Sequence, residues 1–111
     1  MYEERFELLL EVLREVREEG TYFDMSDWRY CALGHLARTD HAQELGFHYS
    51  DSRKSVVYKR KRAYEAAQKF FEIPEYTAAI KLFNPSFYTD TRDTNEVISR
   101  LEDFVEEIPW K

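Results

Sequence analysis

Cysteine, glycine and proline are all scarce in this chain, and it contains no long apolar run. Its 111 residues include one Cys, three Gly and three Pro. Because a single cysteine cannot form an internal disulfide, we expect a reducing, cytoplasmic environment. There is no stretch of about 18 apolar residues, so we expect no membrane-spanning helix. The acidic start of the chain also lacks the features of a signal peptide. Few glycines and prolines predict short loops within a single domain.

The motifs of common catalytic and cofactor sites are missing as well. The sequence has no G-x-S-x-G, no Walker loop, no H-E-x-x-H and no G-x-G-x-x-G. Its carboxylates mostly follow the spacing of solvated helix faces. We therefore predict that the protein is not an enzyme, has no catalytic residues and uses no cofactor.

Negative charge dominates among the residues that are present. The chain has 22 Asp and Glu against 16 Lys and Arg, a net charge of −6, while 43% of its residues are apolar. This composition is typical of a folded globular domain. Nucleic-acid-binding domains are usually basic, so we do not expect nucleic acid as the partner, although a local basic patch stays compatible with it.

The spacing of apolar residues predicts an all-α fold, a compact single-domain bundle of about five helices over residues 1–111. Helices are expected over residues 3–19, 26–37, 53–71, 74–83 and 95–107, with a short helical turn over 41–45. Gly20 should end the first helix and Pro109 the last, whose apolar stripe runs on to Ile108. Residues 47–52 and 86–93 are predicted loops, and no segment alternates regularly enough to predict a strand.

Residues 53–62 contain six cations and no acid. The cations are Arg53, Lys54, Lys59, Arg60, Lys61 and Arg62. Such a stretch can bind phosphates, RNA or an acidic protein surface, and Tyr58 and Tyr64 lie near enough to stack on bases. Alternatively, the stretch is simply solvated, or acids of the first helix neutralise it, within one molecule or between two copies. Both interpretations stay open.

Arg60 is the most informative of these cations. On the predicted helix it shares an apolar stripe with Val56, Ala63 and Ala67. A guanidinium there must reach outward, form a buried ion pair, or hold a phosphate or carboxylate. The ion pair is the favoured interpretation and the anion site is the alternative.

Cys31 and His35 are four residues apart and share one face of a predicted helix. A thiol beside an imidazole can act as a nucleophile, and both side chains bind zinc, with His41 and His48 as further ligands. However, Trp28 lies on the same face, where a small cysteine usually fills the core. We therefore predict core residues here and no metal.

Aromatic residues near the predicted loops are candidate anchors for a partner. They are Tyr22, Phe23, Tyr49, Phe87 and Tyr88. The alternative for each is that it folds back onto the core.

Several segments together carry a resemblance. They are Phe23-Asp24-Met25-Ser26-Asp27-Trp28, Cys31-Ala32-Leu33-Gly34-His35-Leu36, Ala66-Ala67-x-x-Phe70-Phe71-x-Ile73, Leu82-Phe83-x-Pro85 and Glu96-Val97-Ile98-x-Arg100-Leu101-x-x-Phe104. This set resembles a group of small uncharacterised all-helical bacterial and phage proteins with a W-x-x-C-A-x-G-H segment. The resemblance implies a helical architecture and a phage or mobile-element source. The group has no established activity, so no functional residue follows from it. Its members often carry a second cysteine before the motif, and the single Cys31 here argues against paired-cysteine chemistry.

Two functional hypotheses follow. The first is a small acidic cytoplasmic protein-interaction module with a protein partner, such as a phage inhibitor that covers the nucleic-acid-binding groove of a host complex. The second is a binding module for a small anion or nucleotide that uses the basic stretch around Arg60. Self-association of the acidic first helix with the basic stretch of another copy, giving a homo-oligomer, is a third option.

Overall fold

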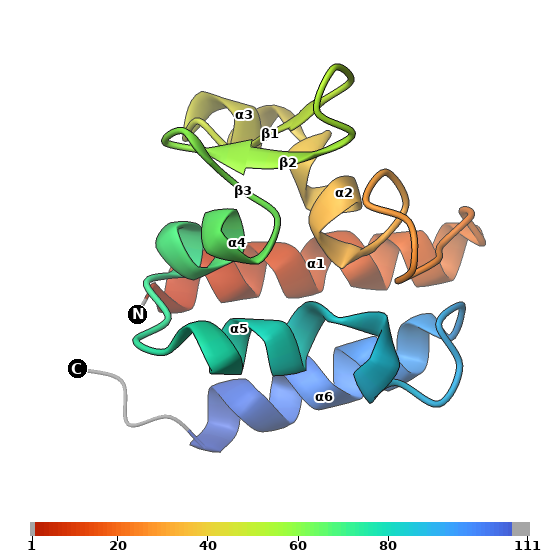
Figure 1. The fold of residues 1–111 in the computed structure, drawn as a ribbon. Helices are drawn as coiled ribbons and strands as arrows, with labels where there is room; N and C mark the ends of the chain where they lie inside the picture. Colours follow the sequence, from red (N-terminus) through yellow and green to blue (C-terminus); the bar gives the residue numbers. More distant parts are fainter. Residues whose placement is uncertain (1, 108–111) are drawn as a thin grey trace.

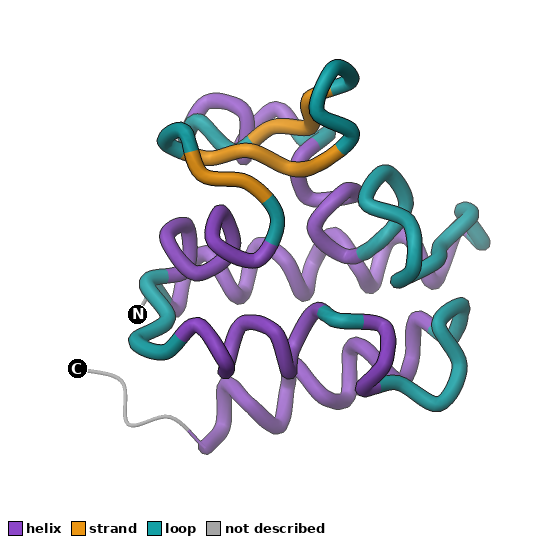
Figure 2. The backbone as a smooth tube through the Cα atoms, viewed as in Figure 1, coloured by secondary structure: helices purple, strands orange, loops and turns teal. Residues whose placement is uncertain are grey.

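The computed structural model describes residues 2–107 and combines six α-helices with a three-stranded antiparallel sheet (Figures 1 and 2). The all-α prediction is therefore wrong, and the fold is α+β. The elements are α1 (Glu3–Glu19), α2 (Ala32–Ala37), α3 (Asp40–Glu44), β1 (His48–Ser50), β2 (Ser55–Tyr58), β3 (Lys61–Arg62), α4 (Tyr64–Phe71), α5 (Tyr76–Phe83), the 3-10 helix η1 (Pro85–Phe87) and α6 (Thr94–Glu107). Within the same residues, no helix has the length and apolar character needed to span a bilayer.

The first helix has the bounds that the sequence predicts. Its buried side chains repeat every three or four positions, as an amphipathic helix requires: Phe6, Leu9, Leu10, Leu13 and Val16. Gly20 follows with a φ of +66°, and its N–H donates a hydrogen bond to the Val16 carbonyl. This left-handed residue ends the helix, as expected for glycine.

α1 runs through the middle of the molecule, and three other helices pack on it (Figure 1). α6 lies along one side, α2 and α4 lie on the other, and α5 packs against α4. The sheet and α3 form one end of the molecule, above α2 and α4 in Figure 1. Aromatic rings fill the space between these layers. Phe6 stacks on Phe71 with ring centroids 4.4 Å apart, and Phe70 meets Tyr58 edge-on at 5.2 Å.

The second predicted helix is shorter than expected. α2 begins at Ala32 rather than at Ser26, because the preceding residues form turns. The Asp24 carboxylate accepts hydrogen bonds from the Ser26 N–H and hydroxyl at 2.9 and 2.6 Å. Cys31 caps the helix instead, and its Sγ accepts a hydrogen bond from the Gly34 N–H at 3.4 Å. The next predicted turn is confirmed as α3.

Residues 48–62 form an antiparallel β-meander, where the sequence predicts a loop followed by a long helix. β1 pairs with β2, and β2 pairs with β3, with Tyr58 opposite Lys61. Val56 and Tyr58 on β2 are buried, with 0% and 5% of their surfaces exposed. The predicted helix over 53–71 is therefore wrong in its first half, and only α4 remains of it.

The C-terminal half follows the prediction more closely. α5 begins at Tyr76 rather than at Pro74, and α6 begins at Thr94. The predicted loop over 86–93 is partly taken up by η1. The predicted helix end at Ile108 and Pro109 lies outside the described residues.

Candidate functional site

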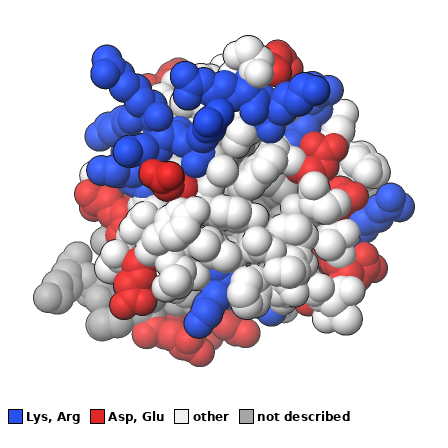
Figure 3. Space-filling model, in the orientation of Figure 1, with Lys and Arg blue, Asp and Glu red and all other residues white. Residues whose placement is uncertain are grey.

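The cations of residues 53–62 lie together at the sheet end of the molecule. We call this group the basic meander; it consists of Arg53, Lys54, Lys59, Arg60, Lys61 and Arg62. Two of them sit in the β1–β2 turn, two form the β2–β3 turn, and two make up β3. All six are exposed, and Figure 3 shows Lys and Arg side chains as a broad band across this end. A helix would have distributed them around its circumference, whereas the meander collects them.

Arg60 does not lie in the apolar environment expected of it. Without a helix it shares no apolar stripe with Val56, and it occupies the exposed two-residue turn between Tyr58 and Lys61. Among the residues that the structure describes, no carboxylate lies within 4.0 Å of its guanidinium. The expected buried ion pair is therefore corrected to a solvent-facing cation.

Little of the positive charge is compensated by neighbouring acids. Within residues 2–107, the basic meander forms a single ion pair, between Lys61 Nζ and Glu65 Oε2 at 3.8 Å. Exposed pairs of this kind contribute about 0–1 kcal/mol. No ion pair of the described residues joins α1 to the basic meander. Intramolecular neutralisation by the acids of α1, the sequence-based alternative, is therefore absent from this part of the chain.

Backbone strain concentrates in the same segment. Of the five non-glycine residues with positive φ in the described chain, four lie between residues 54 and 63: Lys54 at 52°, Lys59 at 47°, Arg60 at 69° and Ala63 at 58°. Glycine or asparagine usually occupies such positions, and each costs a larger side chain about 1 kcal/mol. The β2–β3 turn thus carries two long cations where Asn-Gly would be more stable.

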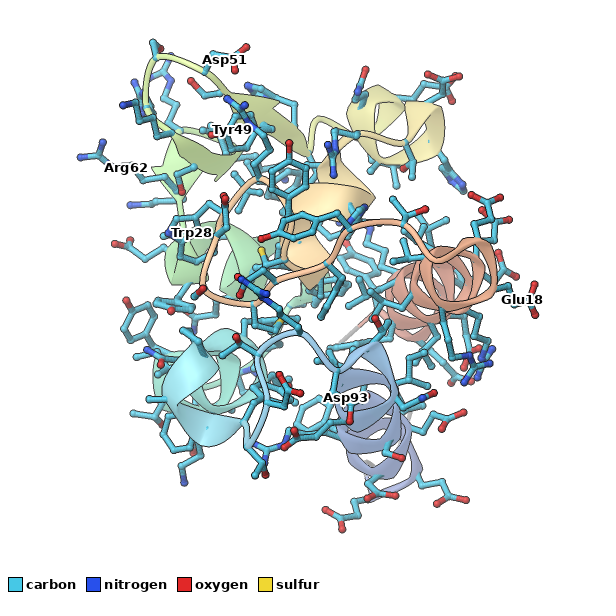
Figure 4. All side chains as sticks on the ribbon, turned by 90° about the vertical axis from the view of Figure 1, so that its right-hand side faces the viewer. Glu18, Trp28, Tyr49, Asp51, Arg62 and Asp93 are labelled. Atoms are coloured by element: carbon cyan, nitrogen blue, oxygen red, sulfur yellow. The ribbon has the colours of Figure 1, made fainter. Side chains whose placement is uncertain are left out.

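A hollow of about 530 Å³ with aromatic walls opens next to the β1–β2 turn. Trp28, Tyr30 and Tyr49 line it, together with the cations Arg29 and Lys54. All three rings are half-buried, so each keeps one part in solvent. Figure 4 shows Trp28 and Tyr49 on this side of the molecule, below the turn that holds Asp51. Lys54 belongs to both surfaces, so the hollow adjoins the basic meander.

Neighbouring side chains hold the walls of this hollow. The Trp28 ring meets Tyr64 edge-on, with centroids 5.1 Å apart. Arg29 lies over the Tyr49 ring at 5.5 Å and reaches the Asp51 carboxylate at 3.4 Å. The aromatic faces are thus fixed in place by contacts behind and beside them.

Tyr58 and Tyr64, proposed from the sequence as stacking residues, lie in different environments. Tyr58 has only 5% of its surface exposed, and its hydroxyl accepts a hydrogen bond from Arg5 at 3.4 Å, so its ring offers no face to a partner. Tyr64 is half-buried and supports Trp28 from behind. The hollow could not be predicted from a local pattern, because Tyr49 is distant in the chain from Trp28 and Tyr30. The alternation Trp28-Arg29-Tyr30 was the available signal.

The Cys31 and His35 pair lies in the protein interior. Burial raises the pKa of the Cys31 thiol to about 11, so the thiol is protonated at neutral pH. His35 Nε2 donates a hydrogen bond to the Tyr22 carbonyl at 2.8 Å, while Nδ1 accepts one from Arg38 at 3.2 Å. Burial, with a smaller contribution from Arg38, lowers the pKa of His35 although the Tyr22 bond opposes the shift. In the part of the chain that the structure describes, no three His, Cys, Asp or Glu side chains are placed to share a metal ion.

Acidic side chains gather on α1 and α6, away from the basic meander. Glu3, Glu7 and Glu11 line one hollow of about 480 Å³. Glu7 also lines a second hollow of about 420 Å³, to which α6 contributes Glu102 and Glu106. On the face drawn in Figure 3, Lys and Arg form a band at the sheet end, and Asp and Glu lie mostly outside it.

The candidate loop aromatics divide by exposure. Phe23 and Tyr88 are buried, and Tyr49 is half-buried in the hollow described above. Tyr22 and Phe87 expose 51% and 42% of their surfaces. Only Tyr49 lies beside the basic meander.

Comparison with known proteins finds no matching family model, curated protein or solved structure.

Proposed function

We propose that this protein is a binding module that contacts an anionic partner through the basic meander. The observation that carries the proposal is the exposure of six cations on one end of a molecule whose net charge is −6. Such a local field attracts an anion, while the remaining surface repels it and so orients the encounter. The partner would approach the sheet end first.

The strained turn supports the same assignment. Lys59 and Arg60 hold positive φ angles without the glycine or asparagine that would relieve them. Strain that local structure does not require commonly marks a functional segment. In this proposal the two side chains are retained for their charge.

Binding of fluorescently labelled inorganic polyphosphate, followed by anisotropy at low salt, tests the proposal. Lys59→Glu with Arg60→Glu should weaken binding by about tenfold or more, because two attractive contacts become repulsive. The matched control changes the same amount of charge elsewhere, with Arg17→Glu and Lys81→Glu, and should leave the affinity within about twofold. Equal weakening by both double variants would reduce the effect to net charge and overturn the proposal.

We place the protein in the cytoplasm as part of this proposal. Its single cysteine is a free, buried thiol. A chain of this kind suits a reducing compartment, where disulfides do not persist.

A second candidate function uses the acidic face. The acids of α1 and α6 line two neighbouring hollows that share Glu7. This concentration favours the hypothesis of a phage-type inhibitor that presents carboxylates to the basic groove of a host protein. Binding of labelled poly-lysine tests it: Glu7→Lys with Glu11→Lys should weaken binding at least tenfold, while Glu72→Lys with Glu75→Lys should not. Equal affinity of all these variants would contradict the hypothesis.

A further inference from the structure

We infer that the anionic partner of the basic meander is a single-stranded nucleic acid, and that the hollow walled by Trp28, Tyr30 and Tyr49 receives one of its bases. The inference rests on the proposed function, because it takes the basic meander as the surface that holds the backbone. It adds a second and different kind of contact, aromatic stacking. Proteins that bind single strands combine these two features, a cationic track and flat aromatic faces beside it.

The positions of the cations fit a strand of nucleic acid. β2 separates the two cationic turns, and the five residue steps from Lys54 to Lys59 span about 17 Å at ~3.3 Å per residue. At the ~3.4 Å rise of a fully stacked strand that distance corresponds to at most about five nucleotides, and an extended single strand would cover it with fewer. A backbone could therefore touch both turns, with Arg53 and Lys54 at one end and Lys59 and Arg60 at the other.

The hollow lies at the Lys54 end of this track. A base that enters it would meet the exposed parts of Tyr49 and Trp28, while Lys54 on the rim stays within reach of the attached phosphate. Arg29, already placed over the Tyr49 ring at 5.5 Å, would add positive charge beside the base. An acidic protein surface would use the cations but would leave the aromatic walls without a partner, which is why we favour nucleic acid.

Two carboxylates also line the hollow, and both are already engaged. Asp24 accepts two hydrogen bonds from Ser26 and lies 3.7 Å from Arg92, contacts that lower its pKa. Asp27 accepts a hydrogen bond from the Arg29 N–H at 2.9 Å. Arg92 thus partly compensates the charge of Asp24, and the hydrogen bonds hold both carboxylates in place.

The test compares two labelled oligodeoxynucleotides of about 15 residues, a length in the range bound by single-strand sites. One is oligothymidine, and the other is an abasic oligomer with the same phosphates. We expect the protein to bind oligothymidine about tenfold more tightly, because only this strand can stack. Tyr49→Ala should remove that preference and leave the affinity for the abasic strand unchanged. Phe87→Ala, which removes an exposed aromatic ring on η1, is the matched control and should change neither affinity.

A second measurement detects binding in the hollow while leaving its lining residues unchanged. In a Trp110→Phe background, the fluorescence of Trp28 should be quenched by oligothymidine but not by the abasic strand. This measurement keeps the inference testable if Tyr49→Ala unfolds the domain.

The outcomes separate this inference from the proposed function. Equal binding of both strands, weakened by Lys59→Glu with Arg60→Glu and without Trp28 quenching, would overturn the stacking site and leave the anion-binding proposal intact. Binding of poly-glutamate but neither oligomer would replace nucleic acid by an acidic protein partner. Failure to bind polyphosphate and both oligomers at low salt would overturn both.

Discussion

Gly34 is the residue at which one added carbon should most disturb the fold. A Cβ there would lie 2.3 Å from the Trp28 carbonyl oxygen and 2.4 Å from that of Arg29. Both atoms belong to the backbone, which cannot rotate away as a side chain can. The backbone of the turn that contains Trp28 therefore packs directly against α2 at Gly34.

We expect Gly34→Ala to destabilise the protein by about 3 kcal/mol, the upper range for overpacking. Urea denaturation measures this loss. Gly20→Ala is the control, since nothing lies within 4 Å of its added Cβ and only the φ of +66° opposes it. That variant should lose about 1 kcal/mol. Equal losses at the two positions would show that the backbone accommodates Ala at Gly34.

His35 should make the stability depend on pH near neutrality. Its pKa is lowered in the folded protein from an ordinary value of 6.5, chiefly by burial. The unfolded chain therefore takes up the proton first as the pH falls. Stability from the neutral imidazole is present above the unfolded pKa and is lost as the pH drops through the folded one.

The measurement is the free energy of unfolding in urea between about pH 7.5 and pH 5.5, where most carboxylates stay ionised. It should decrease toward pH 5.5 in the native sequence. His35→Gln should flatten this dependence, whatever its effect on stability at pH 7.5. An unchanged slope in the variant would assign the dependence to other groups.

At the scale of elements, the β2–β3 turn has cations at positions where other residues would be more stable. Lys59 and Arg60 occupy the two central positions of a hairpin turn with positive φ at both. Asn-Gly is the preferred pair for that geometry. No other turn in the described chain holds two adjacent non-glycine residues in this conformation.

Lys59→Asn combined with Arg60→Gly should therefore raise stability and weaken binding together. We expect a gain of about 1–2 kcal/mol in urea unfolding, because two strained positions are relieved. Affinity for polyphosphate should fall by about tenfold, since two cations are removed. A variant that gains stability while keeping its affinity would show that the turn cations are not contacts.

The same turn explains which elements the sequence can predict. α1 and α6 are predictable because their apolar residues repeat at helical spacing, and Gly20 marks the end of α1. α3 is predictable from its cap residue Thr39 and from Gly46 after it. The meander is not, because its turn lacks the Asn-Gly signal and its strands are only two to four residues long. Val56 also has the spacing to Ala63 and Ala67 that a helix would give. At the site, the run of cations can be recognised in the sequence. The hollow cannot, because it brings together Trp28 and Tyr49, which no local sequence pattern links.

For the whole molecule, the clustered cations of the basic meander should make the binding affinity for a single strand strongly dependent on salt concentration. About five cations of the basic meander are without a carboxylate neighbour in the described residues. At ~0.7 per phosphate contact on a single strand, the logarithm of the association constant should fall with a slope of about −3.5 against the logarithm of salt concentration.

Titration of oligothymidine at several salt concentrations gives this slope. Lys59→Glu with Arg60→Glu should reduce it to about −2, since two contacts are lost. A slope near zero would mean that phosphates do not bind here. Sedimentation of the free protein over the same salt range distinguishes self-association, which high salt would disrupt.

The pairing of α1 with α6 also bears on how the protein is made. α1 contacts α6 along its length, with Arg14 bonded to Glu102 at 2.9 Å and Arg17 to Asn95 at 3.2 Å. During synthesis, this side of α1 stays uncovered until residues 94–107 have left the ribosome, so the core closes late. The chain is thus suited to division in the loop before Thr94. Two separately expressed fragments, one ending there and one carrying α6, should reassemble when mixed.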